Sequence, residues 1–157
     1  MKQPHELYMR EALSLSEESV RKGGGPFGAV IAREGEIIAA AANSVTLSCD
    51  PTAHAEINAI RQACARLQSY DLAGCIIYTS CEPCPMCLGA IYWARLDAVY
   101  YANTRADAQA IGFDDSFIYD EIARPLEQRK IPLSQLLRQE GLTAFEEWRM
   151  KSDKTEY

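Results

Sequence analysis

The sequence predicts an α/β sandwich built on a mainly parallel or mixed sheet. Short apolar segments typical of strands alternate along the chain with segments of helical periodicity, which is the order of elements in layered α/β proteins. The chain has 157 residues, a length that suits one hydrophobic core. Neither repeats nor a linker interrupt the pattern, so we expect a single domain over residues 1–157.

The N-terminal part of the chain predicts a helix and then a hairpin. Residues 4–22 have helical periodicity, and Gly23-Gly24-Gly25-Pro26 ends it. The positions expected on the buried face of this helix are Met9, Leu13, Ser16 and Val20, flanked by Ala12 and Leu15. The apolar runs 27–32 and 36–42 are joined by Arg33-Glu34-Gly35, which is typical of a β-hairpin.

The middle of the chain predicts two helices that alternate with two strands. Asp50 and Pro51 suit the N-cap and the first position of a helix that runs to about Leu67. The strands are expected over 75–79 and 98–102, and a second helix opens between them at Pro85. The inward side chains of this second helix should be Leu88, Ile91 and Tyr92.

The last third predicts short helices over 106–110 and 114–121 and a fifth strand over 131–137. The residues Thr143-Ala144-Phe145-Glu146 have the form of a capping box, so the final helix is expected over 144–152.

Charge and composition limit the classes of partner. Acidic residues outnumber basic ones by 22 to 16, which gives a net charge of −6. Because phosphate neutralisation dominates nucleic-acid binding, this balance favours a small uncharged substrate over a nucleic acid. The longest apolar runs are far shorter than the ~18 residues of a membrane span, and the first residues have no apolar signal core. We therefore expect a soluble, cytoplasmic protein without a membrane partner.

Three of the six cysteines are spaced as metal ligands are. Cys81, Cys84 and Cys87 lie close together, and without a secretory signal metal binding is a better interpretation than a disulfide. The remaining three show no such spacing and are expected to be small buried apolar residues: Cys49, Cys64 and Cys75.

Two segments predict a catalytic metal site. One contains His54, and the other contains Cys84 and Cys87, and each lies at an expected helix start. One imidazole and two thiolates leave zinc a fourth position for water, which is the arrangement of a catalytic site. Helix N-termini favour thiolates and partly offset the charge that two thiolates place on the metal. We expect one Zn²⁺ per subunit.

Glu56 is the residue expected to move protons beside this zinc. If such a site uses water to remove an amine from a substrate ring, it needs a carboxylate that takes a proton from the attacking water and delivers it to the ring and the amine. The order His-x-Glu followed by Pro-Cys-x-x-Cys is the signature of zinc nucleobase deaminases, in which zinc-bound hydroxide attacks the ring. One alternative is a structural zinc site in which Cys81 is a fourth ligand, but Glu56 would then have no task. Another is that Glu82 is a second catalytic acid rather than a solvated or helix-capping residue.

The chain resembles the bacterial guanine deaminases of the cytidine deaminase superfamily over nearly its whole length. The zinc motifs 50–56 and 78–94 and the segment 25–30 carry the general likeness. The segment Gly112-Phe113-Asp114-Asp115-Ser116-Phe117-Ile118-Tyr119 and the terminal Glu156-Tyr157 are similar to the guanine-specific branch. The resemblance implies a three-layer α/β/α domain around a five-stranded mixed sheet.

The resemblance also implies a homodimer and the role of each site residue. The C-terminal helix and tail, about residues 143–157, are expected to be exchanged between subunits. His54, Cys84 and Cys87 match the zinc ligands, and Glu56 matches the proton shuttle. Asp115 matches an acidic residue that helps the amine depart. The expected substrate contacts are Phe27, Asn43, Ala55, Trp93, Asp115 and Tyr157.

The residues themselves leave alternatives at several of these positions. Phe27 and Trp93 could equally be core residues, and Asn43 could form a turn after a strand. Asp114 and Asp115 could both cap the following helix, and the sequence does not show which of them faces the site.

The predicted reaction is the zinc-dependent hydrolysis of guanine to xanthine and ammonia, a step of purine catabolism. A tRNA adenosine deaminase and a cytosine deaminase share the zinc motifs and are the alternatives among enzymes. The alternative outside enzymes is a non-catalytic zinc scaffold, against which the intact Glu56 speaks.

Overall fold

The computed structural model of the protein describes residues 4–157, which form four β-strands and seven α-helices. The strands are β1 (Gly28–Arg33), β2 (Glu36–Ala42), β3 (Ile76–Cys81) and β4 (Ala98–Asn103). The helices are α1 (Pro4–Arg21), α2 (Val45–Ser48), α3 (Ala55–Leu67), α4 (Pro85–Trp93), α5 (Arg105–Ala110), α6 (Ser116–Ala123) and α7 (Arg138–Met150). Contacts divide the chain into two compact units, one ending at Ser116 and one covering Phe117–Tyr157, and each is described by itself.

The first unit contains a mixed sheet with the strand order β2-β1-β3-β4. β1 pairs antiparallel with both β2 and β3, whereas β3 and β4 are parallel. The hairpin between β1 and β2 turns at Glu34 and Gly35, which both have positive φ, as the tightest hairpin turns require. The predicted α/β class and mixed sheet are therefore confirmed.

The predicted fifth strand over 131–137 is wrong, because the sheet of the described residues has four strands. Two residues of this segment explain the error. Pro132 has no N–H to donate to a ladder, and Leu137 has φ of 53°, in the left-handed region just before α7. An apolar run alone does not reveal either restriction.

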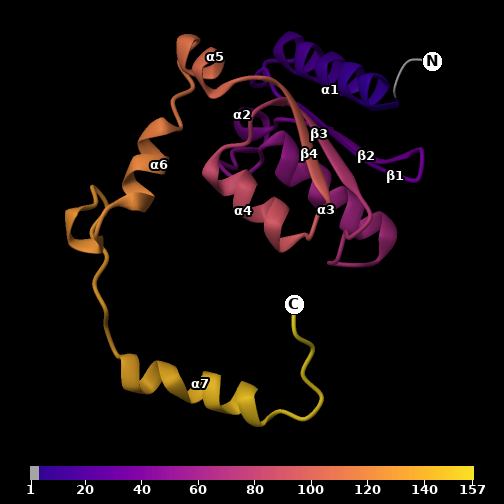
Figure 1. Cartoon of the computed structure of the whole chain (residues 1–157). Coiled ribbons are helices and arrows are strands. Elements are labelled where there is room, and N and C mark those ends of the chain that lie inside the picture. The colour runs from indigo at the N-terminus through magenta and orange to yellow at the C-terminus, as the bar shows by residue number, and fades with distance from the viewer. Residues whose placement is uncertain (1–3) are drawn as a thin grey trace. The chain divides into compact units, whose positions relative to one another are not determined.

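Helices cover both faces of this sheet, with α1 on one side and α3 and α4 on the other (Figure 1). Successive strand residues point to opposite faces, so Val30 and Tyr78 pack under α1 while Ile31 and Ile77 pack under α3. This alternation gives the three layers that the resemblance implied.

The buried face of α1 agrees with the prediction at Met9, Ala12 and Leu15, which pack in a buried cluster with residues of β1 and β3, and differs from it towards the C-terminal end of the helix. Its buried residues are Ala12 and Ser19, whereas Val20 is exposed. The reason is a close approach to β1, because a Cβ built on Gly28 would lie 2.3 Å from the carbonyl oxygen of Ala12. The smallest side chains therefore face the sheet. The spacing of the larger side chains predicted Val20 in place of Ser19, one position further along the helix.

Two helix starts also differ from prediction. α3 begins at Ala55 with His54 as N-cap, and Asp50 instead accepts hydrogen bonds from the backbone N–H and hydroxyl of Thr52 in the preceding turn. α7 begins at Arg138, so Thr143 lies inside the helix and no capping box forms there. Local cap patterns decided both predictions, and tertiary context overrode them.

α4 packs through Cys87 and Ile91, which are buried, with Leu88 partly buried. Tyr92 points outward and is 77% exposed, contrary to prediction. Among the other cysteines Cys75 is buried as expected, Cys64 is partly buried and Cys49 is exposed. No helix within residues 4–157 is long and apolar enough to cross a membrane.

The second unit, Phe117–Tyr157, consists of most of α6, a short 3₁₀ turn (Leu126–Gln128) and α7. Hydrogen bonds within it join Arg129 to the carbonyl of Ile122 and the backbone of Lys130 to Glu121. None of residues 117–157, all of which the structure describes, is buried. Its large apolar side chains, including Phe145 and Trp148, are therefore exposed in the single chain.

A candidate metal centre at two helix N-termini

Three predicted ligands come together in the first unit. The Nδ1 atom of His54 lies 3.5 Å from the Sγ atoms of both Cys84 and Cys87, and the three ligand atoms all lie within 4.8 Å of one another. Within residues 4–157 this is the grouping of histidine, cysteine and acidic side chains placed to hold a metal ion. The structure therefore brings together the three side chains that the sequence predicts as zinc ligands.

The geometry fits zinc. Zn–S bonds of about 2.3 Å and Zn–N bonds of about 2.0 Å at tetrahedral angles separate sulfur from nitrogen by roughly 3.5 Å, which is the separation found here. Three protein ligands occupy three tetrahedral corners and leave the fourth for water. Two soft sulfurs and one imidazole also select zinc over harder cations such as Mg²⁺.

The first turns of two helices hold the ligands. His54 is the N-cap of α3 and Cys84 is the N-cap of α4, with Pro85 at the first position and Cys87 one turn in. Unpaired N–H groups and the positive dipole ends of both helices face the ligands, and both features stabilise thiolates. The predicted location at helix starts is confirmed, although α3 starts later than expected.

The three ligand side chains also shift one another's pKa values. The hydrogen bond from Cys87 lowers the pKa of the Cys84 thiol to about 4, and the bond to His54 acts in the same direction. The contact with Cys84 raises the pKa of the His54 imidazole and that of the Cys87 thiol. One thiolate thus makes the second unfavourable, and a bound divalent cation would offset the negative charge of both.

Glu56 lies beside the ligands without joining them. Its Oε2 is 3.4 Å from the Sγ of Cys87, and its Oε1 accepts a hydrogen bond of 3.3 Å from the hydroxyl of Thr79. Glu56 is only 6% exposed, and this burial raises the pKa of its carboxyl. A raised pKa makes a carboxyl a better proton acceptor than an exposed one, which suits a group that moves protons.

Phe27 and Asn43 are neighbours at the end of the β1–β2 hairpin. The backbone N–H of Asn43 donates to the carbonyl of Phe27, and a Cβ built on Gly25 would lie 3.3 to 3.4 Å from both side chains. The Oδ1 of Asn43 also accepts a hydrogen bond from the N–H of Val45, so the turn-forming interaction is present. Phe27 packs edge to face on Phe113, with ring centroids 4.9 Å apart.

Asp114 and Asp115 have different surroundings. Asp114 is exposed and accepts a hydrogen bond from the N–H of Ser116 at the start of α6. Asp115 is partly buried, and its Oδ1 is shielded from solvent without a hydrogen-bond partner in the described residues. Burial raises the pKa of Asp115, and the negative charge of Cys84 raises it further. Of the two aspartates, Asp115 is therefore the one with a partly buried carboxyl and a shielded oxygen.

The other predicted substrate residues occupy diverse positions. Ala55 is fully buried as the first residue of α3, directly between a ligand and Glu56. Trp93 ends α4 and is 69% exposed, so it is not a core residue. Tyr157 is exposed in the second unit, where its contact with substrate stays a prediction.

Cys81 and Glu82 have structural partners outside the triad. The thiol of Cys81 donates to the carbonyl oxygen of Thr104, and burial raises its pKa to about 11. Glu82 accepts a hydrogen bond from the N–H of Arg105 and pairs with its side chain at 3.2 Å, at the start of α5. The helix-capping interpretation of Glu82 therefore agrees with its contacts.

Sequence reasoning missed Asn58, which braces the loop that carries His54. Its amide donates to the carbonyl of Ala42 and to the hydroxyl of Ser44, and its own N–H donates to the carbonyl of His54. Its position two residues after Glu56 was the available signal, because an amide in the first turns of a helix often binds neighbouring backbone.

Comparison with known proteins agrees with this geometry. The family model described as the cytidine and deoxycytidylate deaminase zinc-binding region matches residues 2–103. The guanine deaminase of Bacillus subtilis (strain 168) is 57% identical over 154 residues, which are 98% of this chain and 99% of that protein. A tRNA-specific adenosine deaminase of Aquifex aeolicus (strain VF5) is 44% identical over 97 residues, 62% of this chain and 64% of that protein.

Solved structures give the same result. An X-ray structure of guanine deaminase from Bacillus subtilis matches 98% of both chains with a TM-score of 0.95 and 57% identity. A structure of guanine deaminase from Nitrosomonas europaea covers 94% of this chain and 85% of its own, with a TM-score of 0.68 and 33% identity. The similarity includes the ligand-bearing segments, and the chain belongs to the cytidine and deoxycytidylate deaminase family of zinc-binding enzymes.

Proposed function

We propose that the protein is a zinc-dependent guanine deaminase that hydrolyses guanine to xanthine and ammonia, a step of purine catabolism. The observation that carries the substrate is the extent of the similarity. The family model ends at residue 103 and the adenosine deaminase match covers 97 residues, whereas the guanine deaminase match extends over 154 residues. The similarity to the guanine deaminase therefore continues through the C-terminal part of the chain that the family model does not cover.

The proposed mechanism assigns proton transfer to Glu56. Zinc held by His54, Cys84 and Cys87 acts, when bound, as a Lewis acid that makes a water molecule acidic near neutral pH. Glu56 takes a proton from the attacking water and passes it to the ring nitrogen beside C2 while the new C–O bond forms. Glu56 then takes the remaining proton from the new hydroxyl group on C2 and delivers it to the exocyclic amine, so that the C–N bond breaks, a carbonyl forms at C2, and ammonia leaves xanthine behind.

Asp115 is proposed to assist the last of these transfers. Its shielded Oδ1 has no hydrogen-bond partner among the described residues, and the substrate amine would supply one. The raised pKa of its carboxyl suits a group that carries a proton.

The remaining predicted residues are proposed to bind the purine. The ring of Phe27 and the indole of Trp93 would contact its faces, and Asn43 would pair with a polar edge. The backbone of Ala55 lies between His54 and Glu56, where it can limit the depth of the base in the site. Tyr157 would close the site from the C-terminal tail.

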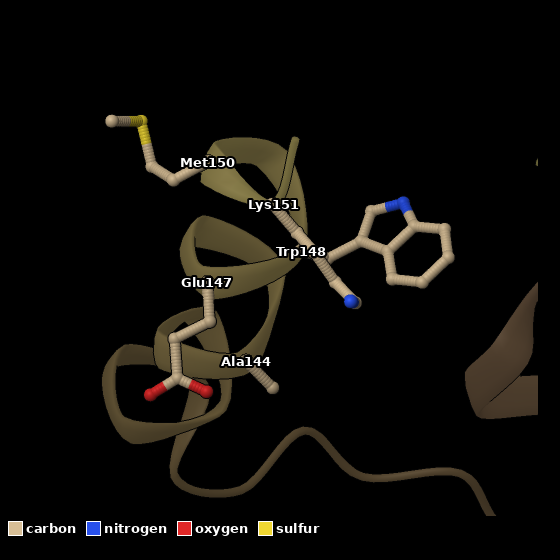
Figure 2. Close-up of a pocket in the computed structure, with 5 residues that line it drawn as sticks. All are labelled: Ala144, Glu147, Trp148, Met150 and Lys151. Carbon is tan, nitrogen blue, oxygen red and sulfur yellow. The ribbon is translucent and has the colours of Figure 1, made fainter. Parts of the chain in front are cut away.

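The proposed enzyme works as a homodimer in which residues 143–157 are exchanged between subunits. The apolar side chains of α7 support this proposal, since Phe145 and Met150 are exposed in the single chain. Figure 2 shows Trp148 and Met150 extending from α7 beside a shallow pocket that they line with Ala144, Glu147 and Lys151. Surfaces of this kind on a soluble enzyme are normally covered by a partner.

The test of the proposed function is an ammonia-release assay on purified, metal-quantified protein. The substrates are guanine, adenine, cytosine, guanosine and ammeline. We expect release from guanine that stops when a chelator removes zinc and returns when zinc is restored. Release from adenine or cytosine but not from guanine would contradict the substrate while leaving the chemistry intact, and release from none of them would favour a non-catalytic scaffold.

A further inference from the structure

Thr79 contacts the proton-carrying residue from a strand that the mechanism has not used. It lies in β3 on the face that packs against α3, because it alternates with Tyr78, which packs against α1. Its side chain is 1% exposed, and its Oγ1 lies 3.3 Å from the Oε1 of Glu56 and 3.0 Å from the carbonyl oxygen of Cys81. The hydroxyl therefore connects the carboxyl of α3 to the end of the central strand.

A hydroxyl suits this place because it can donate a hydrogen bond to an oxygen acceptor. When Glu56 is ionised, Thr79 can donate to its Oε1. When Glu56 carries a proton on Oε2, Oε1 is still an acceptor, so the same hydroxyl can keep donating to it. The carboxyl thus keeps a partner in both forms, although a buried carboxyl without a partner would be costly.

The other side-chain contact of the carboxyl cannot replace this one. Oε2 of Glu56 faces the thiol of Cys87, and a thiolate that serves as metal ligand has no proton to donate. Thr79 is then the side-chain hydroxyl left to orient the carboxyl, and it acts on Oε1 alone. Oε2 stays available for the proton that moves from water to the base.

We propose that Thr79 is a positioning residue for Glu56, holding Oε1 so that Oε2 carries the proton during deamination. This inference rests on the proposed function, since it assigns Thr79 a part in the cycle of Glu56. According to this proposal, the reaction requires the hydroxyl group of Thr79 and not the volume of its side chain.

The experiment compares Thr79→Val, which keeps the shape of the side chain and removes the hydroxyl, with Thr79→Ser, which keeps the hydroxyl. We expect Thr79→Val to lower kcat for guanine roughly tenfold, because one hydrogen bond to a charged group is lost. KM and zinc content should not change, since the partners of this hydroxyl are Glu56 and the carbonyl oxygen of Cys81 rather than any of the three expected zinc ligands. Thr79→Ser should restore most of kcat.

The matched control is Ser80→Ala. Ser80 is also fully buried in β3, but its side chain lies on the opposite face of the sheet from that of Thr79. Its hydroxyl accepts a hydrogen bond from the N–H of Gly28 in the neighbouring strand β1. This variant should keep the wild-type kcat even if it is less stable. If Thr79→Val does not fold, Thr79→Ala and Thr79→Ser form a second pair that differs by the hydroxyl alone.

Three outcomes would overturn the proposal: a wild-type kcat in Thr79→Val, equal losses in the serine and alanine variants at equal zinc content, or a loss of kcat in Ser80→Ala as large as in Thr79→Val. Failure of the proposed function is a separate observation, because it is made on the wild-type enzyme with guanine. Where the wild type deaminates another base, the same variants are compared on that base.

Discussion

Glu56 and the three expected ligands lie close together, yet their contacts differ. His54, Cys84 and Cys87 face one another at the separations of a zinc site, whereas the carboxyl of Glu56 faces Cys87 and Thr79. At the scale of single residues, loss of the metal and loss of proton transfer are therefore separable.

The first prediction separates these two losses. Glu56→Gln should keep zinc and lower kcat by roughly a thousandfold, because an amide cannot carry the proton. Cys87→Ser should lose both zinc and activity, because it removes a ligand. Metal analysis and ammonia release on the same preparations check both. Substantial turnover in zinc-loaded Glu56→Gln would rule out the shuttle role.

The second prediction uses the two neighbouring aspartates as variant and control. Asp115→Asn should lower kcat by about a hundredfold, since burial raises the pKa of this carboxyl and its shielded Oδ1 has no hydrogen-bond partner among the described residues. Asp114→Asn should stay near the wild-type kcat, because Asp114 is exposed and bonds only to the start of α6 in the structure. Equal effects of the two changes would show that the assignment to Asp115 is wrong.

At the scale of elements, the site depends on how closely helices and strands approach. β3 separates its side chains so that Thr79 reaches Glu56 while Ser80 reaches β1. α3 and α4 bring their N-termini to one point because both pack on the same face of the sheet. On the other face α1 approaches β1 so closely that Gly28 has no room for a side chain.

The third prediction tests this close approach. Gly28→Ala should lower the free energy of unfolding by about 2 kcal/mol, because the new methyl group overlaps the backbone of Ala12 and the helix must shift. Thermal melting of the zinc-loaded protein measures the effect. An unchanged melting temperature would show that α1 and β1 can separate at no cost.

At the scale of the whole molecule, the unit Phe117–Tyr157 stands out because none of its residues, all described, is buried. A segment without a core of its own needs apolar contacts from elsewhere to hold a fixed structure. Residues such as Ile131, Leu136 and Phe145 are more than half exposed in the single chain. The proposed exchange of the C-terminal helix would cover such side chains.

The fourth prediction tests the exchange by subunit complementation. We co-express Glu56→Gln, which has an intact tail, with Tyr157→Ala, which has an intact Glu56, and isolate the mixed dimer. If Tyr157 closes the partner's site, the mixed dimer contains one complete site and its activity exceeds that of both homodimers. The measurement is ammonia release from guanine per dimer.

Two results delimit this prediction. A mixed dimer of Glu56→Gln and Cys87→Ser should stay inactive, because each of its sites carries a defect that the partner's tail does not repair. If the mixed dimer of Glu56→Gln and Tyr157→Ala is no more active than its homodimers, the tail serves its own subunit and the exchange proposal is wrong.

The sequence by itself determined the chemistry of the site, because ligand types and spacings fix which metal can bind. The sequence alone predicted His54, Cys84 and Cys87 as ligands and Glu56 as the proton shuttle, and the structure brings the four side chains together. The α/β class was predicted from the sequence as well. Local signals failed where long-range contacts compete with them. They predicted Asp50 as the N-cap of α3, which is His54, and a helix start at Thr143, which lies inside α7. They also predicted a strand at 131–137 that does not form.

Only the tertiary structure decided which side chains meet. No spacing in the sequence connects Thr79 to Glu56, or distinguishes Asp115 from Asp114, since these contacts depend on the packing of a strand or a loop against a helix. Covalent order specifies which chemical groups are present, whereas hydrogen bonds and burial depend on distances between segments that are remote in the chain. For that reason the metal was predictable and the environment of the proton-carrying residue was not.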